Sequence, residues 1–320
     1  MNINFKNIAL AITSVAVLSA CQTTSSTSSS FAQTSGMQYD GKSITNNNIS
    51  VMPGYAHYMK LNPLKSQIPS YDEKGLLAAS WNPSDDVFNN PTIVIMHGGH
   101  GVGSGMWIKA RDLKQRINAN VLLLDSFMSR GMPNNWDRGV EADAIVRTFD
   151  VIAVGKWLKT QGTDPSKTYM MGGSQGGWTT LKAMSAGATQ LAEVKPLYAG
   201  GIAYYPVCDN YNRNGNLRAG QRFVSLAKNG FWGPVLLLTG DEDYATRIED
   251  CQQSVVEHAT KHVRFERGTH GWEIRWRENG EMNKDGSCKW SGNKNFKMCY
   301  DAKHTTEMYI EMTKFINGAK

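Results

Sequence analysis

Short, continuous runs of apolar residues recur along the chain from residue 92 onward, and each is bounded by polar residues, glycine or proline. These runs cover 92–96, 119–125, 169–171, 200–206 and 234–240. Apolar runs of this length are typical of strands that are buried on both faces, as in a parallel sheet. A further short strand is predicted over 262–266.

The segments between these runs carry helical periodicity. Residues 143–160 place apolar side chains at helical spacing, 175–186 have the small residues of a helix packed closely on a sheet, and 302–316 predict an amphipathic terminal helix. Strands that alternate with helices pair in parallel. The pattern therefore predicts an α/β fold with a mostly parallel, doubly wound sheet flanked by helices.

The first residues of the chain are typical of an export signal. Lys6 precedes an apolar stretch of 13 residues, Ile8 to Ala20, which is too short to cross a bilayer as a helix. Leu18-Ser19-Ala20-Cys21 resembles the lipobox of bacterial lipoproteins, whose cysteine becomes lipidated and forms the mature N-terminus. The alternative is an ordinary secretory signal that is cut nearby.

The residues after Cys21 predict a flexible tether. Positions 23–30 are all Ser or Thr, a composition that forms no packed core. We therefore expect a signal peptide over 1–20, a tether over 21–48 and a single domain over 49–320. Because Gln22 is not the aspartate that retains enterobacterial lipoproteins at the inner membrane, we expect a periplasmic protein that is lipid-anchored to the outer membrane.

Composition allows one large core and argues against one class of partner. The chain has 320 residues, of which 41% are hydrophobic, enough for a single α/β domain. Its net charge of +6 is spread along the sequence without a block of Lys and Arg. The sequence therefore predicts no nucleic-acid partner and contact with a membrane only through the lipid anchor.

A glycine-rich turn after the run 169–171 marks a candidate nucleophile. Gly172-Gly173-Ser174-Gln175-Gly176 matches the G-x-S-x-G elbow, in which a sharp strand-to-helix turn exposes a strained serine. Glycine is needed there because a Cβ atom would collide across the turn. The helix that begins at Gln175 directs its free N–H groups, including that of Gln175, toward the reaction centre as an oxyanion donor.

The ends of neighbouring strands supply the partners that such a serine needs. The loop after 92–96 offers a second oxyanion donor at Gly99, and His97 is expected to brace this loop. Asp243 follows the strand 234–240 and is favoured as the acid over Asp241, which can cap a turn. His270 lies on a tight loop after the strand 262–266. The order Ser, Asp, His is that of α/β-hydrolases.

Four cysteines follow the export signal, and an oxidising compartment favours disulfides between them. Cys208 and Cys251 are expected near the carboxyl edge of adjacent strands and can meet, which leaves Cys288 to pair with Cys299; two other pairings are possible. No C-x-x-C or H-E-x-x-H spacing is present, so the sequence predicts no metal site and no cofactor.

Several of these motifs together resemble exported members of the dienelactone hydrolase family. The resemblance runs from about Pro91 to His270 and rests on 124–127 with Arg130-Gly131, the elbow, Tyr204-Tyr205-Pro206 with Cys208, and 240–243 with Thr246 and Cys251. It implies that the acid is Asp243 and the base His270. The founding enzymes use a cysteine where this chain has Ser174.

The sequence thus predicts a serine hydrolase that cleaves small-molecule or polymer-borne carboxylic esters through an acyl-enzyme. A peptidase or amidase of the same fold and a non-catalytic envelope-binding lipoprotein are the alternatives, and the oligomeric state is left open. The aromatic, basic segment near 271–300, closed by the second disulfide, is either a wall of the pocket or a packed surface excursion. Its aromatic residues are Trp272, Trp276, Trp290, Phe296 and Tyr300.

Overall fold

The computed structural model describes residues 68–70, 76–130, 144–188, 191–208, 226–251, 253–274, 280–281 and 298–318. They contain an eight-stranded sheet in the order β1-β2-β4-β3-β5-β6-β7-β8 and a two-stranded sheet of β9 and β10. From β3 to β8 neighbouring strands run parallel, whereas β2 is antiparallel to β4 and β1 is antiparallel to β2. The predicted signal peptide, Cys21 and the tether lie outside the described residues.

The strands β3 to β8 follow the predicted runs, whereas β1, β2, β9 and β10 were not predicted. The strands are β1 (Ile68–Pro69), β2 (Leu76–Asn82), β3 (Thr92–Met96), β4 (Asn120–Asp125), β5 (Thr168–Ser174), β6 (Gly200–Pro206), β7 (Val235–Gly240), β8 (Lys261–Phe265), β9 (Gly280–Glu281) and β10 (Cys299–Tyr300). Every residue of β3, β4, β6 and β7 is buried, as expected of central parallel strands.

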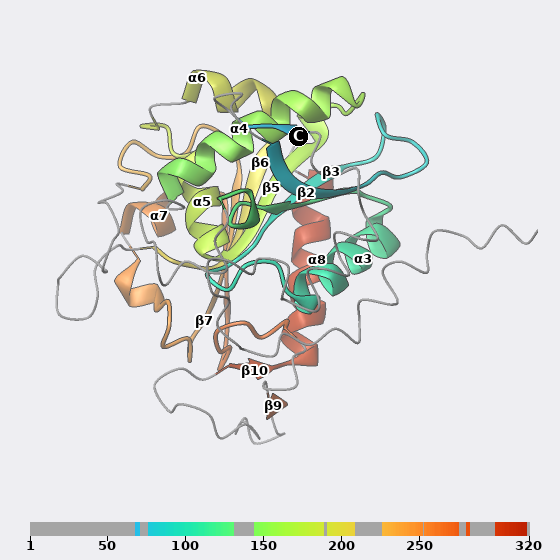
Figure 1. Ribbon diagram of the computed structural model, residues 1–320. Helices are drawn as coiled ribbons and strands as arrows, with labels where there is room; N and C mark the ends of the chain where they lie inside the picture. Colours follow the sequence, from blue (N-terminus) through green and yellow to red (C-terminus); the bar gives the residue numbers. More distant parts are fainter. Residues whose placement is uncertain are drawn as a thin grey trace, which may run out of the picture.

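Helices cover both faces of the large sheet (Figure 1). They are α3 (Ser104–Ile117), α4 (Ala144–Thr160), α5 (Gln175–Met184), α6 (Leu191–Val194), α7 (Gln253–His258) and α8 (Ala302–Gly318), with 3-10 turns at Met128–Arg130, Pro165–Lys167, Lys195–Leu197 and Ile248–Asp250. None of the described helices is long and apolar enough to cross a membrane.

Alternate residues of the strands pack into two separate hydrophobic cores, one on each face of the sheet. In β3, Val94 and Met96 belong to the core beneath α4 and α5, whereas Ile93 and Ile95 belong to the core beneath α3 and α8. This division follows from the two-residue period of a strand, which sends neighbouring side chains to opposite faces. The predicted doubly wound, mostly parallel sheet is confirmed, and the structure adds the antiparallel strands β1 and β2 at one end of the sheet and the helix α3.

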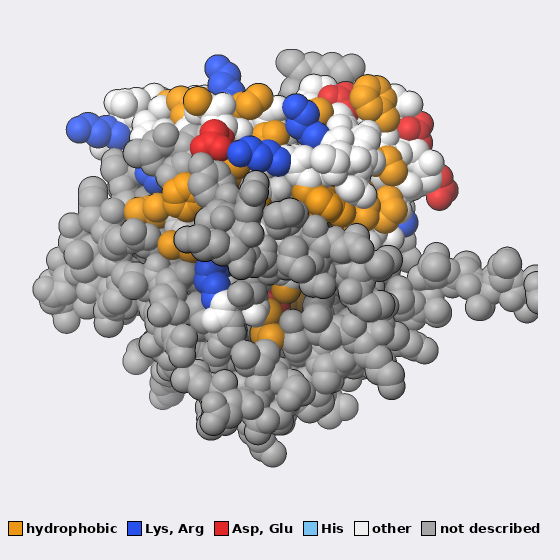
Figure 2. Space-filling view, turned by 45° about the horizontal axis from the view of Figure 1, so that its top comes forward, with side chains coloured by type: hydrophobic (Ala, Val, Ile, Leu, Met, Phe, Trp, Pro, Cys, Tyr) orange, Lys and Arg blue, Asp and Glu red, His pale blue; other side chains and the backbone are white. Residues whose placement is uncertain are grey.

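Charges of both signs are mixed on the surface. On the face that Figure 2 shows, Lys and Arg lie among Asp, Glu and apolar side chains of the described residues. Among the described residues the large hydrophobic side chains that are exposed are Phe88, Tyr244 and Ile310. Of these, Tyr244 lies beside the candidate acid Asp243.

The turn between β5 and α5 is packed so closely that it excludes side chains at two glycines. A Cβ on Gly172 would lie 2.3 Å from the carbonyl carbon of Gly176, and one on Gly176 would lie 2.2 Å from the carbonyl oxygen of Met96. Both neighbours are backbone atoms, so no side chain can rotate away. The predicted need for glycine at the elbow is confirmed.

We expect Gly172→Ala to destabilise the protein by about 3 kcal/mol or more, because backbone must shift to accept the methyl group. Gly318→Ala is the control: a Cβ at the last residue of α8 meets nothing within 4 Å, so its effect should stay within about 1 kcal/mol. Urea unfolding measures both. Equal unfolding midpoints for the two variants would contradict the packing described.

Candidate active site

Ser174 lies where β5 ends and α5 begins, in a strained backbone conformation. Its φ of 54° and ψ of −119° are rarely adopted by a residue with a side chain, and such outliers cluster at functional sites. Gln175 is the first residue of α5, so its N–H is one of the helix donors without an intrahelical partner. The serine is therefore held at the carboxyl edge of the sheet, where ligands of α/β folds bind.

The loop after β3 lies against the same turn. A Cβ on Gly98 would lie 3.4 Å from Ser174 Cβ, and one on Gly99 would lie 3.5 Å from the side chain of Gln175. The absence of side chains lets this backbone approach the serine closely. The loop thus brings Gly99 close to Gln175, the other candidate oxyanion donor.

His97 braces this loop, as predicted. Its Nε2 accepts a hydrogen bond from the Ser126 N–H at 3.1 Å, so the ring proton is on Nδ1, which donates to the Gly98 carbonyl at 2.7 Å. Arg147 Nη2 donates to the His97 carbonyl at 2.7 Å. Complete burial lowers the pKa of His97 well below its usual value, which keeps the ring neutral.

Asp125 fixes the adjacent turn after β4. Its carboxylate accepts the N–H groups of Phe127 at 3.1 Å and Met128 at 3.0 Å. Burial raises the pKa of Asp125 to about 6, against the opposing effect of these two hydrogen bonds. Residues 124–127, one of the motifs that carry the family resemblance, therefore help to hold the loops of the site in place.

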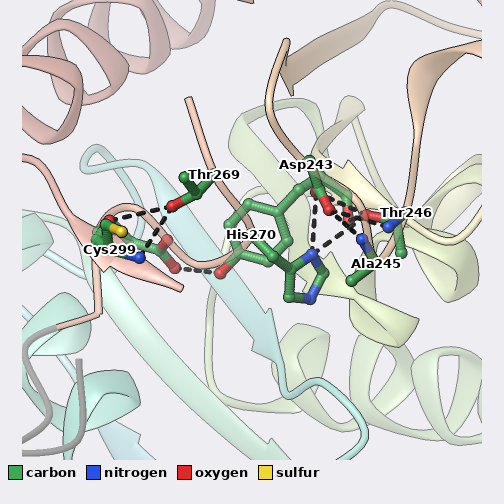
Figure 3. A network of polar contacts seen from close by, with 8 residues as sticks. Asp243, Ala245, Thr246, Thr269, His270 and Cys299 are labelled. Carbon is green, nitrogen blue, oxygen red and sulfur yellow. Dashed lines mark hydrogen bonds and ion pairs between the residues drawn. The ribbon is translucent and has the colours of Figure 1, made fainter. Parts of the chain in front are cut away.

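The predicted acid and base are hydrogen-bonded to each other (Figure 3). His270 Nδ1 lies 2.9 Å from Asp243 Oδ2, and the N–H groups of Ala245 and Thr246 each donate to Asp243 Oδ1 at 2.9 Å. Both side chains are buried. Asp241 instead pairs with Arg264 at the surface. The geometry supports Asp243, and not Asp241, as the partner of the histidine.

Thr246 is a member of this group to which sequence reasoning gave no role. Its hydroxyl lies 2.8 Å from Asp243 Oδ2, 2.9 Å from the Tyr205 carbonyl and 3.2 Å from His270 Nδ1. A hydroxyl carries one proton, so it donates to either the carboxylate or the carbonyl at one time. Its place three residues after the acid is typical of a side chain that closes a turn.

The end of β6 links the histidine to the serine. The Tyr205 ring lies 4.7 Å from the His270 ring, measured between centroids, and the Val207 N–H donates to the Ser174 carbonyl at 3.0 Å. On the loop after β3, burial and the neighbouring His270 both lower the pKa of His100. The serine, its loop and the histidine thus meet around one sheet edge.

A disulfide fastens the acid loop to this edge. Cys208, just after β6, is bonded to Cys251, with 4.5 Å between their Cα atoms and a sequence separation of 43. The predicted pairing of these two cysteines is confirmed. Cys299 is also disulfide-bonded. Its expected partner Cys288 lies outside the described residues, so that pairing stays a prediction.

The two ends of the segment after His270 lie side by side. The Cys299 N–H donates to Thr269 Oγ1 at 2.9 Å, and the Asp301 N–H donates to the Trp272 carbonyl at 2.8 Å. Trp272 is fully buried and belongs to the core beneath α3 and α8, so this aromatic residue is structural. Trp276, Trp290 and Phe296 lie outside the described residues, and a pocket wall there stays a prediction.

Within the described ranges, no group of three or more His, Cys, Asp or Glu side chains is arranged to hold a metal ion. A strained serine, a buried Asp–His pair and two backbone donors are the parts that nucleophilic acyl transfer requires.

Part of the chain is similar in sequence to a known protein family. Residues 119–266 match the model of the prolyl oligopeptidase family of peptidases. No curated protein matches the sequence significantly.

Two solved structures share the fold. A protein assigned as a dienelactone hydrolase from Klebsiella pneumoniae subsp. pneumoniae superposes with a TM-score of 0.54 at 16% identity, over 78% of this chain and 96% of that one. Esterase 2 of Thermogutta terrifontis gives a TM-score of 0.53 at 14% identity, over 79% and 94%. These similarities confirm the expected fold: the chain has the α/β-hydrolase fold, with a mostly parallel sheet flanked by helices.

Proposed function

We propose that this protein hydrolyses carboxylic esters through an acyl-enzyme formed on Ser174. The observation that carries the proposal is the 2.9 Å contact between His270 Nδ1 and Asp243 Oδ2, at the same sheet edge as the strained Ser174. A base held in one tautomer by a buried acid is what a serine nucleophile needs for activation. The names of the two structural neighbours, an esterase and a dienelactone hydrolase, favour esters.

The reaction follows from these positions. Because Nδ1 of His270 carries the proton that is shared with Asp243, Nε2 takes the proton of Ser174 as Oγ attacks the acyl carbon. The carboxylate then stabilises the imidazolium, and the N–H groups of Gln175 and Gly99 hold the oxyanion. His270 returns the proton to the leaving alcohol, and water hydrolyses the acyl-enzyme by the same route.

A peptide or amide substrate is the second candidate, favoured by the match of residues 119–266 to a family of peptidases. The same three side chains serve both reactions, because each proceeds through a tetrahedral oxyanion and an acyl-enzyme. The two differ in the leaving group, an alcohol or an amine. Only a comparison of substrates separates them.

A panel of p-nitrophenyl esters of increasing acyl length and of peptide anilides tests the proposal. We expect turnover of the esters and a loss on the order of 10⁴-fold or more in Ser174→Ala and in His270→Ala, because the triad acts as one unit. Asp243→Asn should cost somewhat less. Asp241→Asn is the matched control at the surface and should keep nearly all activity.

The outcomes separate the three readings. Faster turnover of the anilides than of the esters would assign the peptidase reading instead. A folded wild type with no turnover of either set would favour the non-catalytic envelope-binding protein. A larger loss in Asp241→Asn than in Asp243→Asn would overturn the assignment of the acid.

We also propose that the enzyme is a lipoprotein of the periplasmic side of the cell envelope, with residues 21–48 as a tether for the domain over 49–320. The support is the lipobox-like sequence 18–21, the all-Ser/Thr stretch 23–30 and the Cys208–Cys251 disulfide, since disulfides persist in oxidising compartments.

Metabolic labelling with palmitate tests the anchor. The wild type should incorporate label and fractionate with outer membranes, whereas Cys21→Ser should incorporate none. Cys21→Ser that is labelled as strongly as the wild type, or a wild type recovered unlabelled in the periplasmic fluid, would contradict a lipid on Cys21.

A further inference from the structure

Tyr205 has a backbone conformation that a tyrosine rarely adopts. Its φ is 33°, in the region that favours glycine, and for a bulky residue this is a rare outlier. The register between β5 and β6 shifts here: Gly173 pairs with Tyr204, whereas Ser174 pairs with Pro206. Tyr205 is therefore an extra residue opposite the nucleophile, and bulges beside active sites redirect a side chain.

Gly173 on β5 leaves space for the rings of the two tyrosines on the neighbouring strand β6. A Cβ on Gly173 would lie 2.3 Å from the Tyr204 ring and 2.7 Å from the Tyr205 ring. The residue before the nucleophile must therefore be glycine for these rings to lie where they do. The position of Tyr205 is thus built into the nucleophile elbow itself.

The hydroxyl of Tyr205 is held by a buried ion pair. It donates to Glu273 Oε1, the same oxygen that Lys109 Nζ contacts at 2.6 Å. Lys109 also donates to the Tyr204 hydroxyl at 2.7 Å, and its ammonium lies 4.0 Å from the centre of the Tyr204 ring. All four side chains are buried, and a buried charge persists only when it is paired.

This ion pair lies deep between the helices and the sheet. Lys109 comes from α3 and Glu273 from the loop of His270; burial and the nearby charges of Asp112 and Glu273 raise the pKa of Tyr309 on α8. Glu273 Oε2 has no hydrogen-bond partner among the described residues. The carboxylate therefore holds its neighbours through Oε1, which Tyr205 and Lys109 share.

The ring and the carbonyl of Tyr205 contact the base and the threonine beside the acid. Its ring packs on His270 at 4.7 Å and on Trp272 at 4.9 Å between centroids, and its carbonyl lies 2.9 Å from the Thr246 hydroxyl that also reaches Asp243. One residue thus contacts the imidazole with its ring and the threonine at the carboxylate with its backbone.

We propose that Tyr205 is a positioning residue that fixes the His270 imidazole, and that the Lys109–Glu273 pair holds Tyr205 in place. The inference rests on the proposed function, in which His270 is the base. The strained backbone of Tyr205 costs free energy, and the hydrogen bonds to Glu273 and Thr246 offset this cost. Loss of the hydroxyl frees the ring, and the base loses its fixed orientation.

Tyr205→Phe tests this role, with Tyr198→Phe as the matched control. Tyr198 is also a buried tyrosine with a bonded hydroxyl, which donates to the Val151 carbonyl at 2.7 Å on the face of α4. We expect both variants to lower the melting temperature. With p-nitrophenyl acetate, Tyr205→Phe should lower kcat about tenfold with KM changed less than about twofold, because misplacement of a catalytic group slows chemistry. Tyr198→Phe should keep kcat.

The ion pair is tested by its apolar replacement, Lys109→Met with Glu273→Leu, which removes both charges together and so leaves neither unpaired. If Tyr205 acts through Glu273, this double variant should lose kcat to the same extent as Tyr205→Phe. Adding Tyr205→Phe to it should cost nothing more, because linked residues are not additive.

Three results would overturn the proposal. They are an unchanged kcat in Tyr205→Phe, an equal kcat loss in Tyr198→Phe, or losses that multiply when the ion-pair replacement and Tyr205→Phe are combined. Ser174→Ala is run beside them. Activity that survives in Ser174→Ala would refute the proposed function, whereas an inactive Ser174→Ala with a fully active Tyr205→Phe would refute the positioning role alone.

Discussion

The close approach of α5 to β3 and β5 at the turn around Ser174 is the constraint on which the rest of the site depends. Backbone atoms of Gly172, Gly176 and Met96 come so near one another that a single methyl group has no space at either glycine. This contact forces the chain to reverse within the elbow, which leaves Ser174 at φ 54° with its side chain at the sheet edge. A looser turn would accept other residues and would not expose the serine.

The parallel sheet supplies the second constraint. The carboxyl ends of β3, β5, β6, β7 and β8 meet at one edge, so loops that are far apart in the sequence converge there. His97 and Asp125 stiffen the loops on one side of Ser174, and Thr246 with the Cys208–Cys251 disulfide stiffens the acid loop on the other. Rigid support of this kind is what holds a catalytic group within reach of its partner.

The sequence predicted the sheet and the members of the triad because both have local signatures. Buried strands appear as apolar runs, and Ser174, Asp243 and His270 each lie in the short turn that follows a predicted strand. The antiparallel strand β2, which lies between β1 and β4, has no comparable signal, because Ser80 and Asn82 interrupt its apolar residues.

The side chains that hold the site in place were harder to predict, because their contacts join segments that are far apart in the sequence. Lys109 and Glu273 are 164 residues apart, and Tyr205 and Glu273 are 68 apart. The only local sign was a lysine within a helix segment that also carries Met106, Ala110 and Leu113, all of them buried. The bulge that redirects Tyr205 follows from the pairing of β5 with β6, which no single segment encodes.

Peptide mass spectrometry after reaction with a fluorophosphonate tests the central claim, that Ser174 is the nucleophile, most directly. If Ser174 is the nucleophile, the peptide that contains it should carry one phosphonyl group, formed at the same rate as esterase activity is lost. His270→Ala should be labelled little over the same time. Loss of activity with the phosphonyl group on another residue, or full activity while Ser174 is labelled, would contradict it.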